Sequence, residues 1–443
     1  MVNLSDLISF DDCVEVVQSS LGEGFRVISY RLEKVPGHPG FLGEYAHLTV
    51  STVQIVSSTR VSNGIGYYLL RKFKFQGTKL SHDQSYFVKC LPFTDAKQRE
   101  VVQDLGIFTK EAVCYRELFA RFERNPEKVL KWRPEYWLAR DDLMVMEDLV
   151  DAGYRSMPFQ RSFGKEHVML ILERMAQMHA CSLDLQYNQM KGSRLDEKFG
   201  KMLFETTFMR ENPWFVAGLK GVLKVALDAS KYSRNPDYRS MIQSQLMDKM
   251  DRIYELSQPS HRFQSVIVHK DLWYNNMMFR FEYDQTGNVL YDKPLDCVLI
   301  DFQISRYQPP AIDFFCTIYL LTRRPHRDQL YDFYVQYYHD QLRQKLGKLQ
   351  LQVDLILPWQ QWLESLEHYK LFGLLWSGVL HAYVNLPEGY IGELHAADPE
   401  AYHEFGLVSR DAILMRFFHS DSYYRETLLD SIDETLEYLF EFK

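Results

Sequence analysis

The sequence is poor in cysteine, and its six cysteines are scattered with no C-x-x-C pair. Such spacing disfavours both a disulfide framework and a zinc site. Several of the cysteines lie inside apolar runs, which indicates reduced, buried thiols and favours a cytoplasmic location. The six are Cys13, Cys90, Cys114, Cys181, Cys297 and Cys316.

The chain also lacks any block of Lys or Arg, and its net charge is −8. This charge pattern argues against nucleic acid as the main partner. The longest apolar stretch, residues 371–384, is interrupted by Gly373, Ser377, Gly378 and His381, so we expect a core helix and no membrane span. No basic segment followed by a long apolar core opens the sequence, so we expect no secretory signal. The length of 443 residues favours two or three domains or one bilobal enzyme and leaves the oligomeric state open.

The motif with the clearest chemistry follows a short apolar run at residues 266–268, which is typical of a buried strand. His269, Asp271 and Asn276 come next, in the spacing H-x-D-x-x-x-x-N of a kinase catalytic loop. This spacing also arises by chance, so the motif needs support from elsewhere in the chain.

That support comes from the hairpin predicted directly after the loop. Residues 277–283 have the pattern of a strand, residues 285–288 that of a turn, and a second apolar run at 298–300 leads to Asp301. A hairpin brings Asn276 and Asp301 together at one end. Their oxygens are the hard ligands that Mg²⁺ prefers.

This set of residues suits phosphoryl transfer from ATP, which needs an oriented nucleophile, phosphates held in line and metal to neutralise charge. Asp271 is predicted to accept the proton of a substrate hydroxyl. Asn276 and Asp301 are predicted to hold Mg²⁺ against the ATP phosphates. His269 is expected to support the loop and to take no part in the chemistry.

A lysine and a glutamate upstream fit the same chemistry. Lys89 lies in an apolar strand, where the plain alternative is an edge lysine facing water. In a kinase such a lysine binds phosphate and pairs with a helix glutamate. Glu111, in a predicted helix with an apolar stripe, is the expected partner. Glu117 is the alternative, but its position favours solvent.

Two further segments are candidate nucleotide contacts. Gly43 follows a Pro-Gly-rich turn between two early strands, where glycine lets backbone N–H groups approach phosphate. The alternative is that this segment is a turn with no role in phosphate binding. The strand at 143–146 leads into Glu147 and Leu149, a predicted hinge that would bind adenine through backbone groups.

The remaining chain is predicted to be mainly helical. A helical stripe runs from residue 168 to His179, which we expect to be a core histidine. Asp313 leads another apolar helix, and we expect it to cap that helix or to brace the catalytic loop.

The segments HKDLWYNNMMF, LIDFQ, FVKCLP, EAVCY and MVMEDL together resemble the ecdysteroid-kinase-like family, within the choline-kinase and aminoglycoside-phosphotransferase-like enzymes. The resemblance implies an α+β, protein-kinase-like bilobal fold. Residues 1–147 would form a lobe with an antiparallel sheet, and residues 148–443 a larger, mainly helical lobe. It implies an ATP- and Mg²⁺-dependent enzyme that phosphorylates a hydroxyl of a small molecule, namely an ecdysteroid or another lipophilic or xenobiotic alcohol.

Two positions depart from the family pattern. Relatives commonly have Gly where Lys270 stands, and Lys270 is expected either to steer phosphate or to face solvent. Relatives also tend to have Gly-Asp/Glu-Asn-Tyr-Ser in the phosphate flap, whereas the run here is Gly43-Glu44-Tyr45-Ala46-His47.

Other functions remain as alternatives. A protein kinase needs a long activation segment after the metal-binding Asp, and no Ala-Pro-Glu-type signature follows Asp301 here. A catalytically inactive, ligand-binding relative would be expected to lose the catalytic set, which is intact. A choline-like substrate would need aromatic and acidic groups around its cation.

The acceptor site is predicted only in outline. Trp273 and Tyr274 would form one wall, and Trp376, His381 and Tyr383 the other. The alternative is that these side chains belong to the core.

Overall fold

The computed structural model describes residues 6–35, 43–54, 81–122, 131–160 and 162–442. The chain divides into two compact units, one of residues 1–112 with 135–152 and one of residues 113–134 with 153–443. The boundary expected between residues 147 and 148 stays a prediction. The sequence pattern also predicts a strand at about residues 67–75, and this segment lies outside the described residues.

The first unit contains a five-stranded sheet and the helices α1, α2 and α3. Its strands follow the order β1-β2-β3-β5-β4, and each neighbouring pair is antiparallel. The elements are α1 (Phe10–Leu21), β1 (Phe25–Lys34), β2 (Glu44–Gln54), β3 (Ser81–Cys90), α2 (Ala96–Leu105), α3 (Ile107–Val113), β4 (Tyr136–Ala139) and β5 (Leu143–Glu147).

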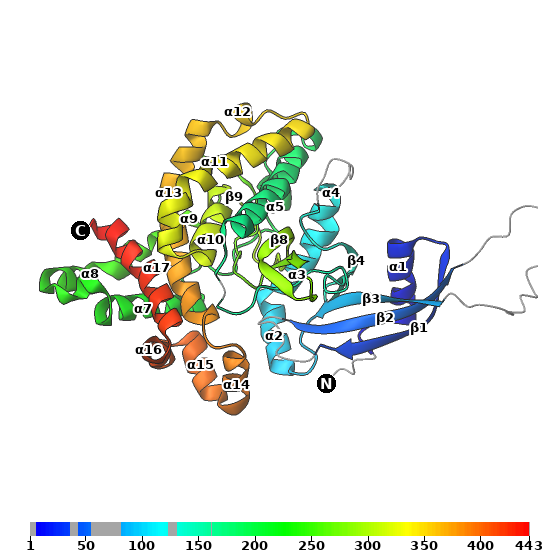
Figure 1. Ribbon diagram of the computed structural model, residues 1–443, viewed down its shortest axis with the longest axis horizontal. Helices are drawn as coiled ribbons and strands as arrows, with labels where there is room; N and C mark the ends of the chain where they lie inside the picture. Colours follow the sequence, from blue (N-terminus) through cyan, green and yellow to red (C-terminus); the bar gives the residue numbers. More distant parts are fainter. Residues whose placement is uncertain (1–5, 36–42, 55–80, 123–130, 161, 443) are drawn as a thin grey trace, which may run out of the picture. The chain divides into compact units, whose positions relative to one another are not determined.

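The helix α1 begins where the sequence provides a cap. Ser9 and Asp12 form a reciprocal capping box, which satisfies backbone N–H groups at the helix start. Figure 1 shows α1 over one face of β1, β2 and β3. Cys13, Val16 and Val17 of α1 are buried in one core with apolar side chains of the sheet.

The second unit is mainly helical and contains two small antiparallel sheets. After Val113 come η2 (Cys114–Phe119), α4 (Ala120–Phe122), α5 (Lys165–Asp184), η4 (Leu185–Gln189), α6 (Leu195–Phe199), α7 (Pro213–Asp228), η5 (Lys231–Arg234), α8 (Pro236–Met250) and α9 (Arg252–Leu256). The strands are β6 (Val266–Val268), β7 (Met277–Tyr283), β8 (Val289–Leu299) and β9 (Arg306–Gln308). The last helices are α10 (Ala311–Leu321), α11 (Arg324–Lys348), α12 (Val353–Ile356), α13 (Trp359–Val384), α14 (Tyr390–Ala397), α15 (Pro399–Leu407), α16 (Asp411–Ser420) and α17 (Ser422–Phe440).

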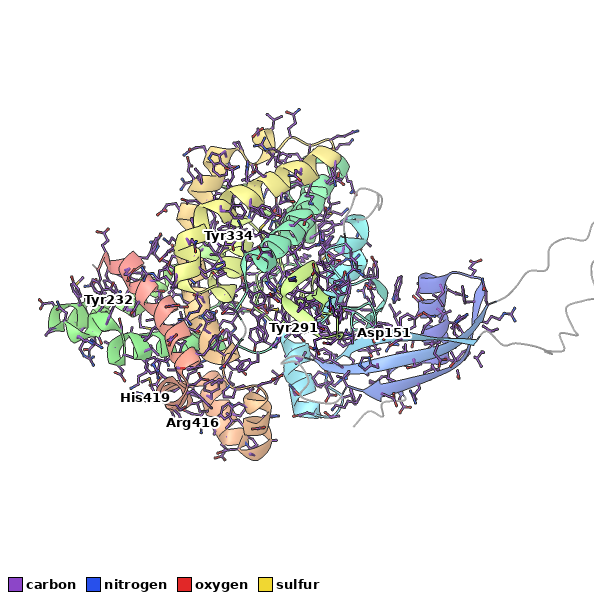
Figure 2. The ribbon with its side chains drawn as sticks, viewed as in Figure 1. Asp151, Tyr232, Tyr291, Tyr334, Arg416 and His419 are labelled. Carbon is purple, nitrogen blue, oxygen red and sulfur yellow. The ribbon has the colours of Figure 1, made fainter. Side chains whose placement is uncertain are left out.

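The interior of the second unit is built on α5, α10 and α13, which are buried along most of their length. The long helices α11 and α17 pack against α5 and α13, as Figure 1 shows. Tyr232, labelled in Figure 2, ties η5 to α17 because its hydroxyl donates to Glu437 at 2.6 Å. An antiparallel sheet in one unit and a larger helical unit are the α+β arrangement that the sequence predicts.

No helix in the described part of the chain is long and apolar enough to cross a membrane. The apolar stretch at 371–384 belongs to α13, and the predicted core helix is confirmed.

Candidate active site

The catalytic-loop motif directly follows β6, as the sequence predicts. The carboxylate of Asp271 is oriented by Asn276, whose Nδ2 donates to Asp271 Oδ2 at 2.9 Å and to the Asp271 carbonyl at 2.8 Å. Asp271 is 9% exposed and Asn276 3% exposed. The spacing of five residues therefore lets the amide fix the rotamer of the predicted base. The other amide atom of Asn276, Oδ1, is the one suited to a metal.

The predicted hairpin is present as β7 and β8. Its register pairs Met277 with Leu299, and the backbone N–H of Ile300 donates to the carbonyl of Asn276 at 3.0 Å. Asn276 and Asp301 therefore come together at one end of the hairpin, as predicted. An amide oxygen and a carboxylate in this position fit a Mg²⁺ ion that takes its other ligands from phosphate and water.

Asp301 has a left-handed backbone, with φ +69°. The next residue, Phe302, is fully buried and packs edge-on against Trp132, Phe119 and Tyr115, at ring distances of 5.4, 5.1 and 5.9 Å. Aromatic pairs in this geometry are favourable beyond the area that they bury. The cluster therefore fixes the backbone beside Asp301 although Asp301 itself lies at a strained turn.

His269 supports the loop, as expected. Its Nε2 lies 2.8 Å from the carbonyl of Ile300, and its Nδ1 accepts from the backbone N–H of Asp271 at 3.3 Å. Burial lowers the pKa of His269, which favours the neutral ring. A neutral ring with its proton on Nε2 satisfies both contacts and joins the loop to the end of β8.

Asp313 braces the loop from α10. Its two carboxylate oxygens accept from the backbone N–H groups of His269 at 2.7 Å and Lys270 at 2.6 Å. His179 lies 3.1 Å from the same carboxylate and 2.8 Å from the hydroxyl of Tyr338. The expected core histidine is thus fully buried, and it also links α5 to the brace.

The expectation for Lys270 is wrong on both alternatives. Its side chain is fully buried, so it neither faces solvent nor is open to a phosphate. Its Nζ donates to Glu205 Oε2 at 2.6 Å, and the same oxygen accepts from Arg306 at 2.5 Å. The sequence does not indicate Glu205 as the partner of Lys270, because Glu205 lies 65 residues away in a segment without periodicity.

In the first unit, Lys89 and Glu111 form the predicted ion pair. Lys89 Nζ and Glu111 Oε2 are 2.5 Å apart, and both side chains are buried. Glu117 is 45% exposed and pairs with Arg121 at 3.1 Å, so the solvent-facing interpretation of Glu117 is confirmed. The helix that carries Glu111 widens into the π-helical turn η2 directly after α3. Such turns are frequent at functional sites.

Gly43 lies against the lysine of this pair. A Cβ added at Gly43 would meet the Cys90 carbonyl at 3.2 Å and the Lys89 Cε at 3.6 Å. A side chain here would therefore crowd Lys89. The rest of the predicted flap, residues 36–42, lies outside the described residues.

The predicted hinge follows β5. The backbone N–H of Glu147 donates to the carbonyl of Glu135, and the side chain of Glu147 accepts from the N–H of Glu135. Leu149 is buried. Between them, Asp148 accepts from Ser85 at 2.8 Å and lies 3.1 Å from His47 Nδ1, which fixes the turn after the strand.

The two walls predicted for an acceptor site meet only in part, through Tyr274 of one wall and His381 of the other. Tyr274 and His381 line one cavity of about 30 Å³ in the second unit, which has room for about two water molecules. Trp376 instead packs on Phe208 at 4.9 Å, and Tyr383 packs on Trp214 at 5.6 Å, both in the core.

No curated protein matches the chain. Among solved structures, a microcompartment-associated aminopropanol kinase is 14% identical with a TM-score of 0.35, covering 93% of this chain and 99% of its own. A streptomycin–ATP complex of APH(2")-IIa is 13% identical with a TM-score of 0.32, covering 91% and 99%. The choline kinase LicA from Streptococcus pneumoniae is 12% identical with a TM-score of 0.30, covering 82% and 100%.

The ecdysteroid kinase-like family profile matches residues 68–351, which is more than half of the chain. Together with the antiparallel sheet of one unit and the helices of the other, this match confirms the predicted protein-kinase-like bilobal fold class. The chain belongs to the ecdysteroid kinase-like family.

Proposed function

We propose that this protein is a small-molecule kinase that transfers the γ-phosphoryl group of ATP to a hydroxyl of its substrate. The observation that carries the proposal is the end of the β7–β8 hairpin, where Asn276 orients Asp271 and lies beside Asp301. Membership of the ecdysteroid kinase-like family supports the same class of reaction.

Asp271 is the proposed base. Its carboxylate would accept the proton of the acceptor hydroxyl while the oxygen attacks phosphorus. Asn276 and Asp301 would hold Mg²⁺, which neutralises the charge on the phosphates. In a reaction of this kind the protein contributes mainly position and electrostatics, so the buried contacts that fix Asp271 are part of the catalytic apparatus.

Lys89 is proposed to bind the α- and β-phosphates of ATP, with Glu111 holding it in place. The 2.5 Å ion pair supports this role because a buried lysine needs a fixed counter-charge. Gly43 would let the flap backbone approach the phosphates, and the backbone of Glu147 and Leu149 would bind adenine.

The proposed acceptor is an ecdysteroid or another lipophilic or xenobiotic alcohol, which the family assignment supports. The alternatives are a choline-like substrate and a kinase-like protein that binds ligand without turnover. The six cysteines are buried free thiols, which supports the proposed cytoplasmic location. We also propose that residues 1–147 act as a kinase-like lobe that carries the flap, Lys89 and Glu111, and that residues 148–443 act as the catalytic and acceptor-substrate lobe.

A thermal-shift experiment tests the nucleotide part of the proposal first. A ligand that binds only the folded state raises its apparent stability. We expect Mg²⁺-ATP to raise the melting temperature and a chelator to remove the effect. A panel of hydroxylated compounds, including ecdysteroids and choline, is then added with Mg²⁺-ATP. A further shift, followed by phosphorylation of that compound, identifies the acceptor. No shift at any Mg²⁺ concentration would favour the inactive alternative.

A further inference from the structure

We propose that Lys270 is a positioning residue, which ties the catalytic loop to Glu205 and thereby holds Asp271 in place. The proposal rests on the proposed function, because it needs Asp271 as the base. It concerns how one charged side chain, with no access to solvent, controls the neighbouring residue.

The backbone of Lys270 has φ +73°, a left-handed conformation that residues with a Cβ rarely adopt. Contacts on both sides hold it there. Its N–H donates to Asp313, and its carbonyl accepts from the Sγ of Cys316 at 3.3 Å. The turn that presents Asp271 is therefore a strained one that its surroundings must maintain.

The side chain adds a third anchor to this turn. Lys270 Nζ donates to Glu205 Oε2 and lies 4.3 Å from the ring centre of Phe208 and 5.8 Å from that of Phe372. Cation–π contacts of this kind are stronger when water is excluded. The end of the lysine is thus enclosed on several sides and cannot move without breaking a buried charge pair.

Glu205 is a rigid partner because its other oxygen is also occupied. Glu205 Oε1 accepts from the backbone N–H groups of Thr206, Thr207 and Phe208 at 2.9–3.1 Å. The carboxylate therefore fixes its own turn and Lys270 together. Movement of the 205–208 segment would be transmitted through the side chain of Lys270 to the backbone directly before Asp271.

A second cation completes the cluster. Arg306 of β9, which pairs with Val268 of β6, donates to the same Oε2 as Lys270. Two cations therefore share one carboxylate in the interior.

Burial lowers the pKa of Lys270 to about 8, and the charge of Glu205 opposes this shift. The other titratable groups that face Lys270 are Arg306 and the Cys316 thiol. The amine of Lys270 is therefore charged at pH 7 and loses its proton in mildly alkaline solution.

The test uses Lys270→Met, which keeps the apolar stem and removes the charge. The matched control is Lys345→Met, because Lys345 is also a buried lysine paired with a glutamate (Glu173, 2.8 Å), but it lies on α11. Mg²⁺-ATP alone is the probe, and two quantities are measured from pH 6.5 to 9.5: its affinity, and its acceptor-free hydrolysis, in which Asp271 would orient water. We expect Lys270→Met to bind Mg²⁺-ATP like the wild type but to hydrolyse it at least about tenfold more slowly.

The pH profile separates positioning from simple structural support. Wild-type hydrolysis should fall as the pH rises through about 8, while Mg²⁺-ATP affinity stays constant. Glu205→Gln should move this fall to lower pH, because removing the carboxylate lowers the pKa of Lys270 further. These two profiles decide the question even if Lys270→Met does not fold. Wild-type rates and a wild-type profile in Lys270→Met, or equal losses in Lys270→Met and Lys345→Met, would overturn the proposal. A wild type that neither binds nor hydrolyses Mg²⁺-ATP would instead overturn the proposed function, and with it the role of Lys270.

Discussion

Lys89 and Glu111 form an ion pair with 2.5 Å between Nζ and Oε2, in the interior of the first unit. Their side chains are 6% and 1% exposed, so neither charge is solvated by bulk water. A buried pair of this kind contributes less to net stability than its short distance suggests, because both ions lose hydration. In the proposed kinase, the pair would hold the Lys89 amine in one position.

The first prediction concerns this pair. Lys89→Met and Glu111→Gln each remove one partner and should lower Mg²⁺-ATP affinity. The two losses should be strongly non-additive, because each side chain positions the other. Removing one buried partner also costs about 3–5 kcal/mol of stability, so binding is measured at a temperature where each variant is folded. A double variant whose loss equals the sum of the single losses would argue against the pair.

The second prediction concerns the base. Asp271→Asn keeps the shape of the side chain and the contact from Asn276 but cannot accept a proton. We expect turnover to fall by at least about 10²-fold while Mg²⁺-ATP affinity changes little. The measurement is a thermal shift and a turnover assay on the same preparation. Unchanged turnover would remove Asp271 from the role of base.

The third prediction concerns the metal. Asp301→Ala should abolish the Mg²⁺-dependent part of nucleotide binding, because the predicted carboxylate ligand is lost. Glu282→Gln is the matched control, since Glu282 lies in the same hairpin but is 49% exposed. Its carboxylate makes a long ion pair with Lys293, at 3.7 Å. Titrating Mg²⁺ at constant ATP checks both variants. Equal Mg²⁺ dependence in Asp301→Ala and the wild type would contradict the metal assignment.

The fourth prediction is a pH dependence of stability. The pKa of Lys270 is about 8 in the folded protein, below its ordinary value of 10.5. Between these pH values the unfolded chain binds more protons, so the contribution of Lys270 to the free energy of unfolding rises with pH, by up to about 3 kcal/mol. Comparing wild type and Lys270→Met by chemical denaturation at pH 7.5, 8.5 and 9.5 isolates this term. If the free energy of unfolding changed with pH in the same way in both proteins, Lys270 would have its ordinary pKa.

This stability change has the opposite sign from the activity change proposed for Lys270. Above pH 8 the contribution of Lys270 to the free energy of unfolding should rise while the activity falls. General alkaline damage would lower stability and activity together. The two measurements therefore distinguish deprotonation of Lys270 from an unspecific loss of folded protein.

The sequence predicted the catalytic hairpin because its signals are local. Residues 277–283 alternate, a turn follows, and Asp301 ends an apolar run, so the pairing of β7 with β8 follows from the pattern. The register shifts after Arg280 do not follow from it. Lys89 and Glu111 are 22 residues apart, yet one strand and one helix with clear apolar periodicity were enough to pair them.

Contacts between distant, irregular segments escaped prediction. Glu205 lies in a segment of turns, and nothing near it in the sequence marks it as the partner of Lys270. The short strand β9 was missed because three residues before Pro309 give no periodic signal. A buried lysine in an apolar loop does demand a counter-charge, but the sequence cannot say which of 59 acidic residues supplies it.

The aromatic cluster around Phe302 has a spectroscopic consequence. The indole of Trp132 stands perpendicular to the Phe302 ring at 5.4 Å, and the carbonyl of Trp132 accepts from the N–H of Leu299 at 2.8 Å. A fluorophore is therefore attached to the strand end that carries Asp301. Any ligand that shifts Asp301 changes the surroundings of this indole, so the difference in emission between the wild type and Trp132→Phe is an intrinsic optical signal for events at Asp301.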